Sequence, residues 1–394
     1  MLIMRMIHKC MCWLLALSLL PGWTMRAWAE PAAGDGRADR AAVQPELSAR
    51  CAVLMGPEGQ ILYEKDAHRS CPIASTTKLL TALVVLERCD LRETVEIPAE
   101  CCQIEGSSMD LRPGERYTVE ELLTGLLLAS GNDAAEALAL HCAGDRERFV
   151  DWMNERAAAL GMDESHFADP HGLPAEDHFG SAADLGRLML ACLEEPALME
   201  LLGKPAAEIQ GKSYVNHNKL LWLCPGCLGG KTGYTREAGR CLVSCCEREG
   251  TRLVCVTLDA PDDWNDHKAL YAWGFARYAL RDLTEGVAYT VPVVSGARST
   301  VVVSADPLPR FLARDTQLRL RTELPPFVFA PARAGEVCGR VTVYAGDAEL
   351  GSAPLRFTQD VAAGSCGPST GREDYGPETA KDHSGLRLDG APQG

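Results

Sequence analysis

The chain has 394 residues, of which 46% are hydrophobic, and it carries a formal net charge of -15 at pH 7. This length is sufficient for one large hydrophobic core and a second, smaller domain. The negative charge, which no cluster of lysine and arginine offsets, argues against a nucleic-acid partner.

The first residues have the pattern of an export signal. Arg5 and Lys9 precede the apolar run CMCWLLALSLL, and small residues after the run provide a cleavage site. The run is interrupted at Pro21, which favours a cleaved signal over a membrane-spanning helix. We therefore predict a signal peptide at residues 1–29, a polar linker at 30–48, and export to the cell envelope or the extracellular space.

Cysteine is unusually frequent. Of 17 cysteines, 15 remain when Cys10 and Cys12 are removed with the signal, and an exported protein would normally pair them as disulfides. The odd remainder and the position of many cysteines inside apolar runs favour small buried side chains instead. Cys224 and Cys227 have redox-like or zinc-like spacing, but no second pair completes a metal site. We predict a turn there, with or without a local disulfide, and no metal.

The central part of the chain alternates between strand and helix patterns. Residues 49–66 read as a hairpin around a Gly-Pro-Glu-Gly turn, and a helix opens at Ser75. Helical periodicity follows, interrupted by Ser-Gly-Asn, and a helix capped by Ser181 comes next. Two apolar strands and a last helix complete residues 49–285. Strands at both ends of this region predict an α+β domain, an antiparallel sheet with helices packed on it.

The remainder of the chain has a different character. Residues 286–362 contain several short runs of alternating apolar and polar residues, including STVVVSAD and RVTVYAGD. This pattern predicts a small all-β domain of sandwich or barrel type. Residues 363–394 are polar and rich in glycine and proline, so we expect a disordered tail.

Ser75 lies three residues before Lys78 at the start of an apolar, helix-periodic run. A serine hydroxyl is a poor nucleophile at neutral pH, and an uncharged amine one helical turn away could accept its proton. The start of a helix also offers N–H groups that stabilise an oxyanion. By itself, however, this spacing is common, and a helix-capping serine beside a surface lysine is then the better explanation.

Two further short motifs follow in order. They are Ser-Gly-Asn at residues 130–132 and Lys-Thr-Gly at residues 231–233. Each alone could be an ordinary structural feature, a turn between helices and the start of a strand. Together with Ser-Thr-Thr-Lys, and in this order, they are typical of penicillin-binding proteins and class A β-lactamases.

On these motifs the chain resembles the low-molecular-weight penicillin-binding proteins, the serine D-alanyl-D-alanine carboxypeptidases of the peptidase S11 family. The surrounding sequences GSSMDLRPGERYTVEELLTGLLLASGND, ADPHGLP and GGKTGYT strengthen the resemblance. It extends from about residue 49 through the β-rich region. It implies a β-lactamase/transpeptidase-like catalytic domain followed by a small all-β domain.

The resemblance also implies roles for individual residues. Ser75 would attack the carbonyl carbon between two D-alanines and form an acyl-enzyme. Lys78 would be the base, kept neutral by burial and by the charge of Lys231. Ser130 would pass a proton to the departing amine. The N–H groups of Ser75 and Tyr234 would form the oxyanion hole.

Substrate recognition follows by the same resemblance. Asn132 would hold the substrate backbone, and Lys231 and Thr232 would bind its terminal carboxylate. Gly233 would let a substrate strand lie along the sheet edge. His217 is expected near the carboxylate pocket, where both a substrate contact and a solvent-facing or capping role remain open.

Some positions depart from the family pattern. The frequent Asn-Pro-x-Gly-Leu is Asp-Pro-His-Gly-Leu here, and Asp169 can make the same local turn. We interpret His171 and His178 as structural. The tail has no apolar face, so a C-terminal amphipathic membrane anchor is not expected.

Expected partners are peptidoglycan stem peptides ending in D-Ala-D-Ala, with β-lactam antibiotics as covalent inhibitors and no cofactor. Two rival functions remain. A serine β-lactamase shares the nucleophile, but we find no Glu-x-x-x-Asn-like deacylation element between the second and third motifs. A catalytically silent wall-binding scaffold would have no reason to retain Ser75, Lys78 and Lys231.

Overall fold

The computed structural model describes residues 43–364, which form two compact units with separate apolar cores. The division falls between Arg277 and Tyr278, apart from two short segments assigned to the second unit, whereas the sequence placed it at about residue 285. The predicted signal peptide at 1–29 and nearly all of the predicted tail lie outside the described residues.

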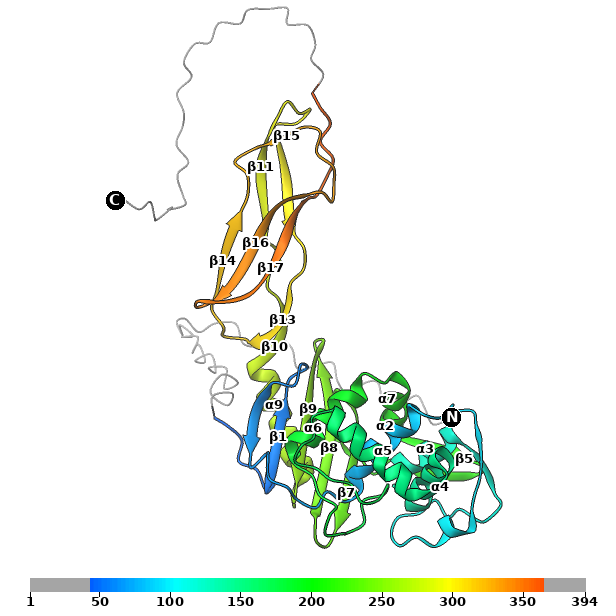
Figure 1. Ribbon diagram of the computed structural model, residues 1–394. Coiled ribbons are helices and arrows are strands. Elements are labelled where there is room, and N and C mark those ends of the chain that lie inside the picture. The colour runs from blue at the N-terminus through cyan, green and yellow to red at the C-terminus, as the bar shows by residue number, and fades with distance from the viewer. Residues whose placement is uncertain (1–42, 365–394) are drawn as a thin grey trace, which may run out of the picture. The chain divides into compact units, whose positions relative to one another are not determined.

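The first unit is built on a five-stranded sheet with the strand order β2-β1-β9-β8-β7 (Figure 1). The hairpin of the sequence analysis forms two of its strands, and the strand that contains the Lys-Thr-Gly motif and the two strands after it form the other three. The prediction that both ends of this region contribute to one sheet is confirmed. The strands are β1 (Cys51–Met55), β2 (Ile61–Lys65), β7 (Cys227–Thr235), β8 (Gly239–Arg248) and β9 (Thr251–Leu258).

Helices cover both faces of this sheet, which explains why every residue of β1 is buried. Val53 lies 3.4 Å from the position that a Cβ on Gly186 would occupy, in α6 (Ala182–Leu193). Its neighbour Leu54 lies 2.7 Å from the corresponding position at Gly274, in α9 (Asp263–Arg277). Because consecutive strand residues point to opposite faces, these two glycines allow close helix packing on each side.

The other helices of the first unit form an apolar cluster around α2, which is buried along eight of its nine residues. Thr118 and Glu121 form a capping box at the start of α3, and the Ser181 hydroxyl caps α6 as predicted. The elements are η1 (Ala74–Thr77), α2 (Lys78–Leu86), η2 (Ala99–Gln103), α3 (Val119–Leu128), α4 (Asn132–Ala143), α5 (Arg146–Ala159), α7 (Pro196–Gly203) and α8 (Leu220–Leu223).

Two small hairpins complete the first unit. One pairs β3 (Thr94–Glu96) with β4 (Arg116–Thr118), and the other pairs β5 (Ala206–Ile209) with β6 (Lys212–Val215). Among residues 43–364, no helix combines the length and the apolar composition needed to cross a bilayer.

The second unit is β-rich, as the sequence predicted. Its main sheet has six strands in the order β14-β16-β17-β12-β11-β15, and its core is a cluster of valine, leucine and other apolar side chains. The strands are β10 (Tyr278–Asp282), β11 (Ala288–Val294), β12 (Thr300–Ala305), β13 (Pro309–Ala313), β14 (Leu318–Glu323), β15 (Val328–Phe329), β16 (Val337–Ala345) and β17 (Ala348–Phe357).

Cysteines in the described chain are mostly buried among apolar neighbours, in line with the sequence expectation. One pair departs from it, because Cys89 and Cys142 form a disulfide. Cys224 and Cys227 flank a turn, and no disulfide links them. Within residues 43–364 no three histidine, cysteine or acidic side chains are placed to hold a metal ion.

Candidate active site

The serine and the lysine of the first motif meet at the start of a buried helix. Ser75 belongs to the short 3₁₀ helix η1, and Lys78 is the first residue of α2. One helical turn brings the Nζ of Lys78 to 3.0 Å from the Oγ of Ser75. Ala74, just before the serine, has a φ of 46°, a strained conformation that the surrounding structure must maintain.

The Lys78 amine is completely buried and donates two further hydrogen bonds. Its Nζ lies 2.6 Å from the Oδ1 of Asn132 and 2.7 Å from the main-chain oxygen of His171. Burial, and next the nearby Lys231, lowers the pKa of Lys78 well below the usual value for lysine. These are the two causes that the sequence analysis expected.

The second and third motifs also come together, although about 100 residues separate them in the chain. Ser130 occupies the break between α3 and α4 with a φ of 61°, a left-handed conformation that a non-glycine residue adopts at a cost. Lys231 lies in β7, and its Nζ is 3.0 Å from the Oγ of Ser130 and 2.8 Å from the main-chain oxygen of Thr232. Burial lowers the pKa of Lys231 to about 7.

Gly233 passes very close to the backbone around the serine. A Cβ at this position would lie 3.0 Å from the main-chain oxygen of Ile73 and 3.1 Å from the backbone nitrogen of Ser75. Any side chain would therefore push β7 away from η1. The third motif ends in glycine because the strand must approach the serine backbone directly.

A cavity of about 700 Å³ opens in front of the serine. Of the predicted site residues, some line the cavity and others lie behind its wall. The lining includes Ser75, Ser130, His217, Thr232, Gly233 and Tyr234, whereas Lys78, Asn132 and Lys231 do not contribute to it. Both polar atoms of the Asn132 side chain are hydrogen-bonded. Its Oδ1 accepts from Lys78, and its Nδ2 donates to the main-chain oxygen of Glu105.

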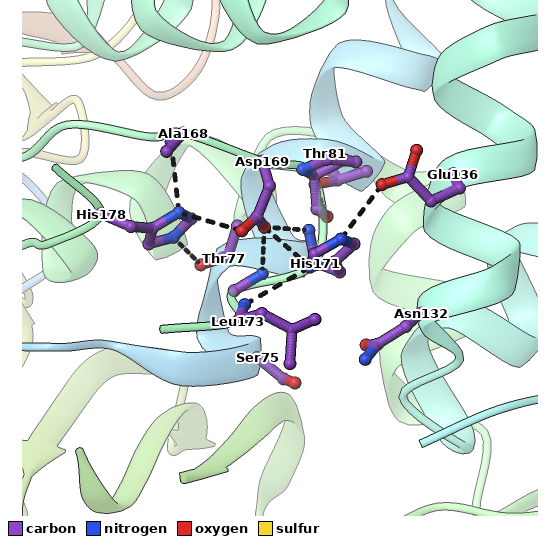
Figure 2. Close-up of polar contacts among 12 residues, drawn as sticks. Ser75, Thr77, Thr81, Asn132, Glu136, Ala168, Asp169, His171, Leu173 and His178 are labelled. Carbon is purple, nitrogen blue, oxygen red and sulfur yellow. Dashed lines mark hydrogen bonds and ion pairs between the residues drawn. The ribbon is translucent and has the colours of Figure 1, made fainter. Parts of the chain in front are cut away.

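Behind the serine lies a buried network centred on His171 (Figure 2). The imidazole lies between two carboxylates, with Nδ1 2.9 Å from Asp169 and Nε2 3.0 Å from Glu136. Asp169 also accepts the backbone N–H groups of His171 and Gly172, which is the turn predicted for it. His178 lies 3.7 Å from Asp169 and 2.7 Å from the hydroxyl of Thr77 in η1.

The charges in this network favour a protonated His171. Burial alone would lower the pKa of His171, but its bonds to Asp169 and Glu136 outweigh burial and raise it. Burial likewise opposes ionisation of Asp169, yet the partnership with His171 holds the pKa of that carboxyl below its usual range. Burial lowers the pKa of His178, so this second ring stays neutral. The two histidines are structural, as expected, and His171 additionally holds Lys78 through its main-chain oxygen.

Sequence reasoning missed several residues of the site. Asp133 accepts the backbone N–H groups of Met109 and Leu111 and thereby shapes the loop that brings Ser107 to the cavity. The quoted stretch GSSMDLRP was a signal for this loop, but it does not reveal which residue faces the cavity. Other lining residues had no local signal at all, among them Ser213, Asn216, Arg240, Asp263 and Trp264.

The arrangement has the parts needed for acyl transfer through a serine ester. A hydroxyl faces a cavity, and a buried amine of lowered pKa lies within hydrogen-bond distance of it. A second hydroxyl, that of Ser130, lines the same cavity, and a second buried amine lies within hydrogen-bond distance of it. Such a serine can be activated without histidine, since the amine can accept its proton.

Comparison with known proteins agrees with this chemistry. The family described as D-alanyl-D-alanine carboxypeptidase, peptidase S11, matches residues 38–262, more than half of the chain. The D-alanyl-D-alanine carboxypeptidase DacB2 of Mycobacterium tuberculosis is 37% identical over 230 residues, which cover 55% of this chain and 79% of that protein.

Two longer matches include the second unit. The D-alanyl-D-alanine carboxypeptidase DacC of Escherichia coli K12 is 29% identical over 356 residues, covering 83% of this chain and 88% of that protein. The crystal structure of penicillin binding protein 5 from Haemophilus influenzae superposes with a TM-score of 0.63 at 26% identity, covering 81% of this chain and 99% of that one. With its fold, its serine and lysine pair and these matches, the chain belongs to the serine-type D-alanyl-D-alanine carboxypeptidases of the peptidase S11 family.

Proposed function

We propose that this protein removes the terminal D-alanine from peptidoglycan stem peptides through an acyl-enzyme on Ser75. The observation that carries the proposal is the buried Lys78 amine, 3.0 Å from the Ser75 hydroxyl at the cavity wall. An amine of lowered pKa in that position is neutral for enough of the time to accept the serine proton.

The reaction begins when the Oγ of Ser75 bonds to the carbonyl carbon of the penultimate D-alanine and its proton moves to Lys78. The backbone N–H groups of Ser75 and Tyr234 stabilise the oxyanion. The C–N bond then breaks, and Ser130 passes a proton to the departing D-alanine amine. Water attacks the remaining ester, releases the shortened peptide and restores the serine.

In this proposal, Lys231 and Thr232 bind the terminal carboxylate of the peptide. Lys231 is anchored by Ser130 and by its own strand, so its position is defined before substrate binds. His217 lies exposed at the cavity and can contact the same end of the peptide. Asn132 accepts a hydrogen bond from Lys78, and its amide is assigned a contact with the substrate backbone.

The substrate and the inhibitors follow from family membership. Members of this family act on the cell wall, and penicillins imitate a D-Ala-D-Ala end that carries a reactive amide. We propose that the protein is exported and acts at the cell wall on peptides ending in D-Ala-D-Ala, and that β-lactams acylate Ser75.

The test uses the full-length mature protein, a fluorescent penicillin and a peptide ending in D-Ala-D-Ala. We expect a long-lived fluorescent adduct on the protein and release of D-alanine from the peptide. Ser75→Ala should abolish both, with a loss of about 10⁴-fold or more in turnover, because no other group supplies the nucleophile. The exposed Ser70, five residues earlier, provides the matched control Ser70→Ala, which should retain both activities.

Other outcomes would identify the rival functions. Rapid penicillin turnover without D-alanine release would mean a β-lactamase. Absence of both adduct and release in a folded wild-type protein would mean a silent scaffold. Retained D-alanine release by Ser75→Ala would refute the assignment of the nucleophile.

A further inference from the structure

Three cysteines lie in contact with one another at the start of β7, and the catalytic proposal uses none of them. The Sγ of Cys246, in β8, is 3.6 Å from the Sγ of Cys224. Cys246 is also the direct cross-strand partner of Cys227, and the two thiols are hydrogen-bonded. Cys224 and Cys227 have the spacing of a redox motif, but no disulfide links them, and both contact Cys246 instead.

The geometry allows Cys246 to form a disulfide with either neighbour. Direct partners in an antiparallel pair have Cα atoms about 4.5–5.5 Å apart, and a disulfide spans about 4.4–6.8 Å between Cα atoms. The thiol of Cys224 already lies in contact with the same sulfur. One disulfide therefore leaves a third thiol beside it, which is the arrangement that thiol–disulfide exchange requires.

Exposure and acidity distinguish the three thiols. Cys224 and Cys246 are buried, whereas Cys227 is half-buried and reaches the surface. The hydrogen bond from Cys246 lowers the pKa of Cys227, and the hydrogen bonds with Cys224 and Cys227 raise the pKa of Cys246. The thiolate is the reactive form of cysteine, so Cys227 is the thiol best suited to attack a molecule arriving from solvent.

This cluster lies close to the active-site cavity without lining it. The Nδ2 of Asn218 donates to the Cys227 sulfur over 3.9 Å, and the residues on either side of Asn218, His217 and Lys219, line the cavity. None of the three cysteines is part of that lining. Penicillin labelling can therefore report on the folding of cysteine variants without involving the thiols in the catalytic machinery.

We propose that Cys227, Cys246 and Cys224 form a thiol–disulfide exchange site that reacts with small-molecule disulfides of the glutathione type. Cys227 is the entry thiol, and Cys246 is the thiol through which exchange passes. The product is a buried disulfide between Cys224 and Cys246, with Cys227 restored as a thiol. This inference goes beyond the proposed function and does not depend on it.

The reaction runs in three exchanges. The Cys227 thiolate attacks oxidised glutathione, forms a mixed disulfide and releases one glutathione thiolate. Cys246 then attacks the Cys227 sulfur, the second glutathione leaves as a thiolate, and this thiolate takes up the proton that Cys246 loses. Finally, Cys224 attacks the Cys246 sulfur, and Cys227 leaves with the proton from Cys224. In total, two protein thiols are oxidised and one glutathione disulfide is reduced to two thiols.

The experiment follows these bonds in the full-length mature protein. The protein is reduced, mixed with oxidised glutathione and sampled over time by rapid alkylation. Trypsin leaves Cys224 and Cys227 on residues 220–231 and Cys246 on residues 241–248, so fragmentation of the linked peptides locates each bond. We expect a glutathione adduct on Cys227 at early times, and later a Cys224–Cys246 disulfide with Cys227 alkylated.

Single substitutions should stop the sequence at defined points. Cys246→Ser should accumulate the glutathione adduct on Cys227, because the thiol that resolves it is gone. Cys224→Ser should stop at a Cys227–Cys246 disulfide. Cys227→Ser should slow formation of the Cys224–Cys246 disulfide by at least about tenfold, because the two remaining thiols are buried.

Cys338→Ser is the matched control, because Cys338 is a half-buried cysteine of the second unit. Its disulfide products and their rates should equal those of the wild type. Fluorescent penicillin labelling and thermal unfolding identify any variant that is misfolded. A Cys224–Cys227 disulfide as the wild-type product, or the absence of any bond to Cys246 in folded protein, overturns the inference.

The same samples separate this inference from the catalytic proposal. A wild-type protein that forms the Cys224–Cys246 disulfide through Cys227 but releases no D-alanine would refute the proposed function alone. A protein that releases D-alanine but forms its disulfide at an unchanged rate in Cys227→Ser would refute the entry role of Cys227 and leave the proposed function intact.

Discussion

At the scale of single residues, the site depends on two buried amines whose pKa values are both lowered by burial. Lys78 and Lys231 are both fully enclosed, and each lies 3.0 Å from a serine hydroxyl. Burial lowers the pKa of both amines, and for Lys78 the charge of Lys231 adds to the effect of burial. The proposed mechanism uses Lys78 as the proton acceptor and Lys231 in its protonated form.

The rate of acylation by a fluorescent penicillin should therefore follow a bell-shaped dependence on pH. The base must be neutral, so the rate rises as pH passes upward through the lowered pKa of Lys78. Lys231 must be protonated, so the rate falls as pH passes through about 7. Stopped-flow measurement of acylation from pH 4 to 10 tests this. A rate that still rises at pH 10 would contradict the assignment.

A substitution at Lys78 tests whether this amine is the base. Arginine cannot lose its proton in this environment, so Lys78→Arg should slow acylation by about 10²–10⁴-fold, the range for loss of a general base. Lys268→Arg, the same change on α9 away from the cavity, should leave the rate unchanged. Normal acylation by folded Lys78→Arg would show that another group is the base.

At the scale of elements, one loop connects the nucleophile helix with α4. Residues 169–173 are held by Glu136 in α4 and, through His178, by Thr77 in η1 (Figure 2). Gly172 makes this possible, since its φ of 89° and its approach to the main-chain oxygen of Ala74 leave no room for a side chain. The loop delivers the main-chain oxygen of His171 to Lys78.

Glu136→Ala should therefore reduce both stability and activity. Removing one member of a buried ion pair costs about 3–5 kcal/mol, because the imidazolium of His171 loses a partner. Denaturant unfolding should show this loss, and penicillin acylation should slow as the His171 oxygen moves. Glu147→Ala, on the exposed face of α5, is the control. A Glu136→Ala protein with wild-type stability would argue against a charged His171.

The same network sets a pH window for stability. His171 has a raised pKa in the folded protein, so its contribution is complete below its unfolded pKa and is lost as pH rises through the folded value. Asp169 has a depressed pKa, so its contribution is present above its unfolded pKa and is lost as pH falls through the folded value. Glu136→Gln should reduce the stability that His171 contributes at the alkaline end of this pH range, since His171 loses a charged partner.

At the scale of the whole molecule, two apolar cores form independently of each other. One cluster contains only residues of the first unit, and the other contains only residues of the second. Multi-domain chains often unfold in more than one step because each core can melt separately.

Calorimetry of the full chain should accordingly show two unfolding transitions. Acylation by penicillin should raise the midpoint of one of them and leave the other in place, because a ligand stabilises the unit that binds it. The control is the full-length Ser75→Ala protein, treated with penicillin in the same way. A single transition that shifts as a whole would contradict independent cores.

The amino-acid sequence by itself determined the local features of this protein. Ser75 and Lys78 lie within one helical turn, so their proximity follows from helix geometry alone. Strand and helix periodicity, the cap at Ser181 and the turn at Asp169 are likewise decided by residues close together in the chain, and each agrees with the structure.

Tertiary structure alone decided the properties that depend on distant residues. The hydrogen bond between Lys231 and Ser130 and the hydrogen bond between Lys78 and Asn132 each join segments far apart in the chain, and the lowered pKa of Lys78 depends on such contacts. No local pattern encodes them, because burial and electrostatic environment are set by whichever elements pack around a group. The three short motifs and the resemblance that they carry therefore indicated the chemistry, and packing decided how strongly each amine is buried and what surrounds it.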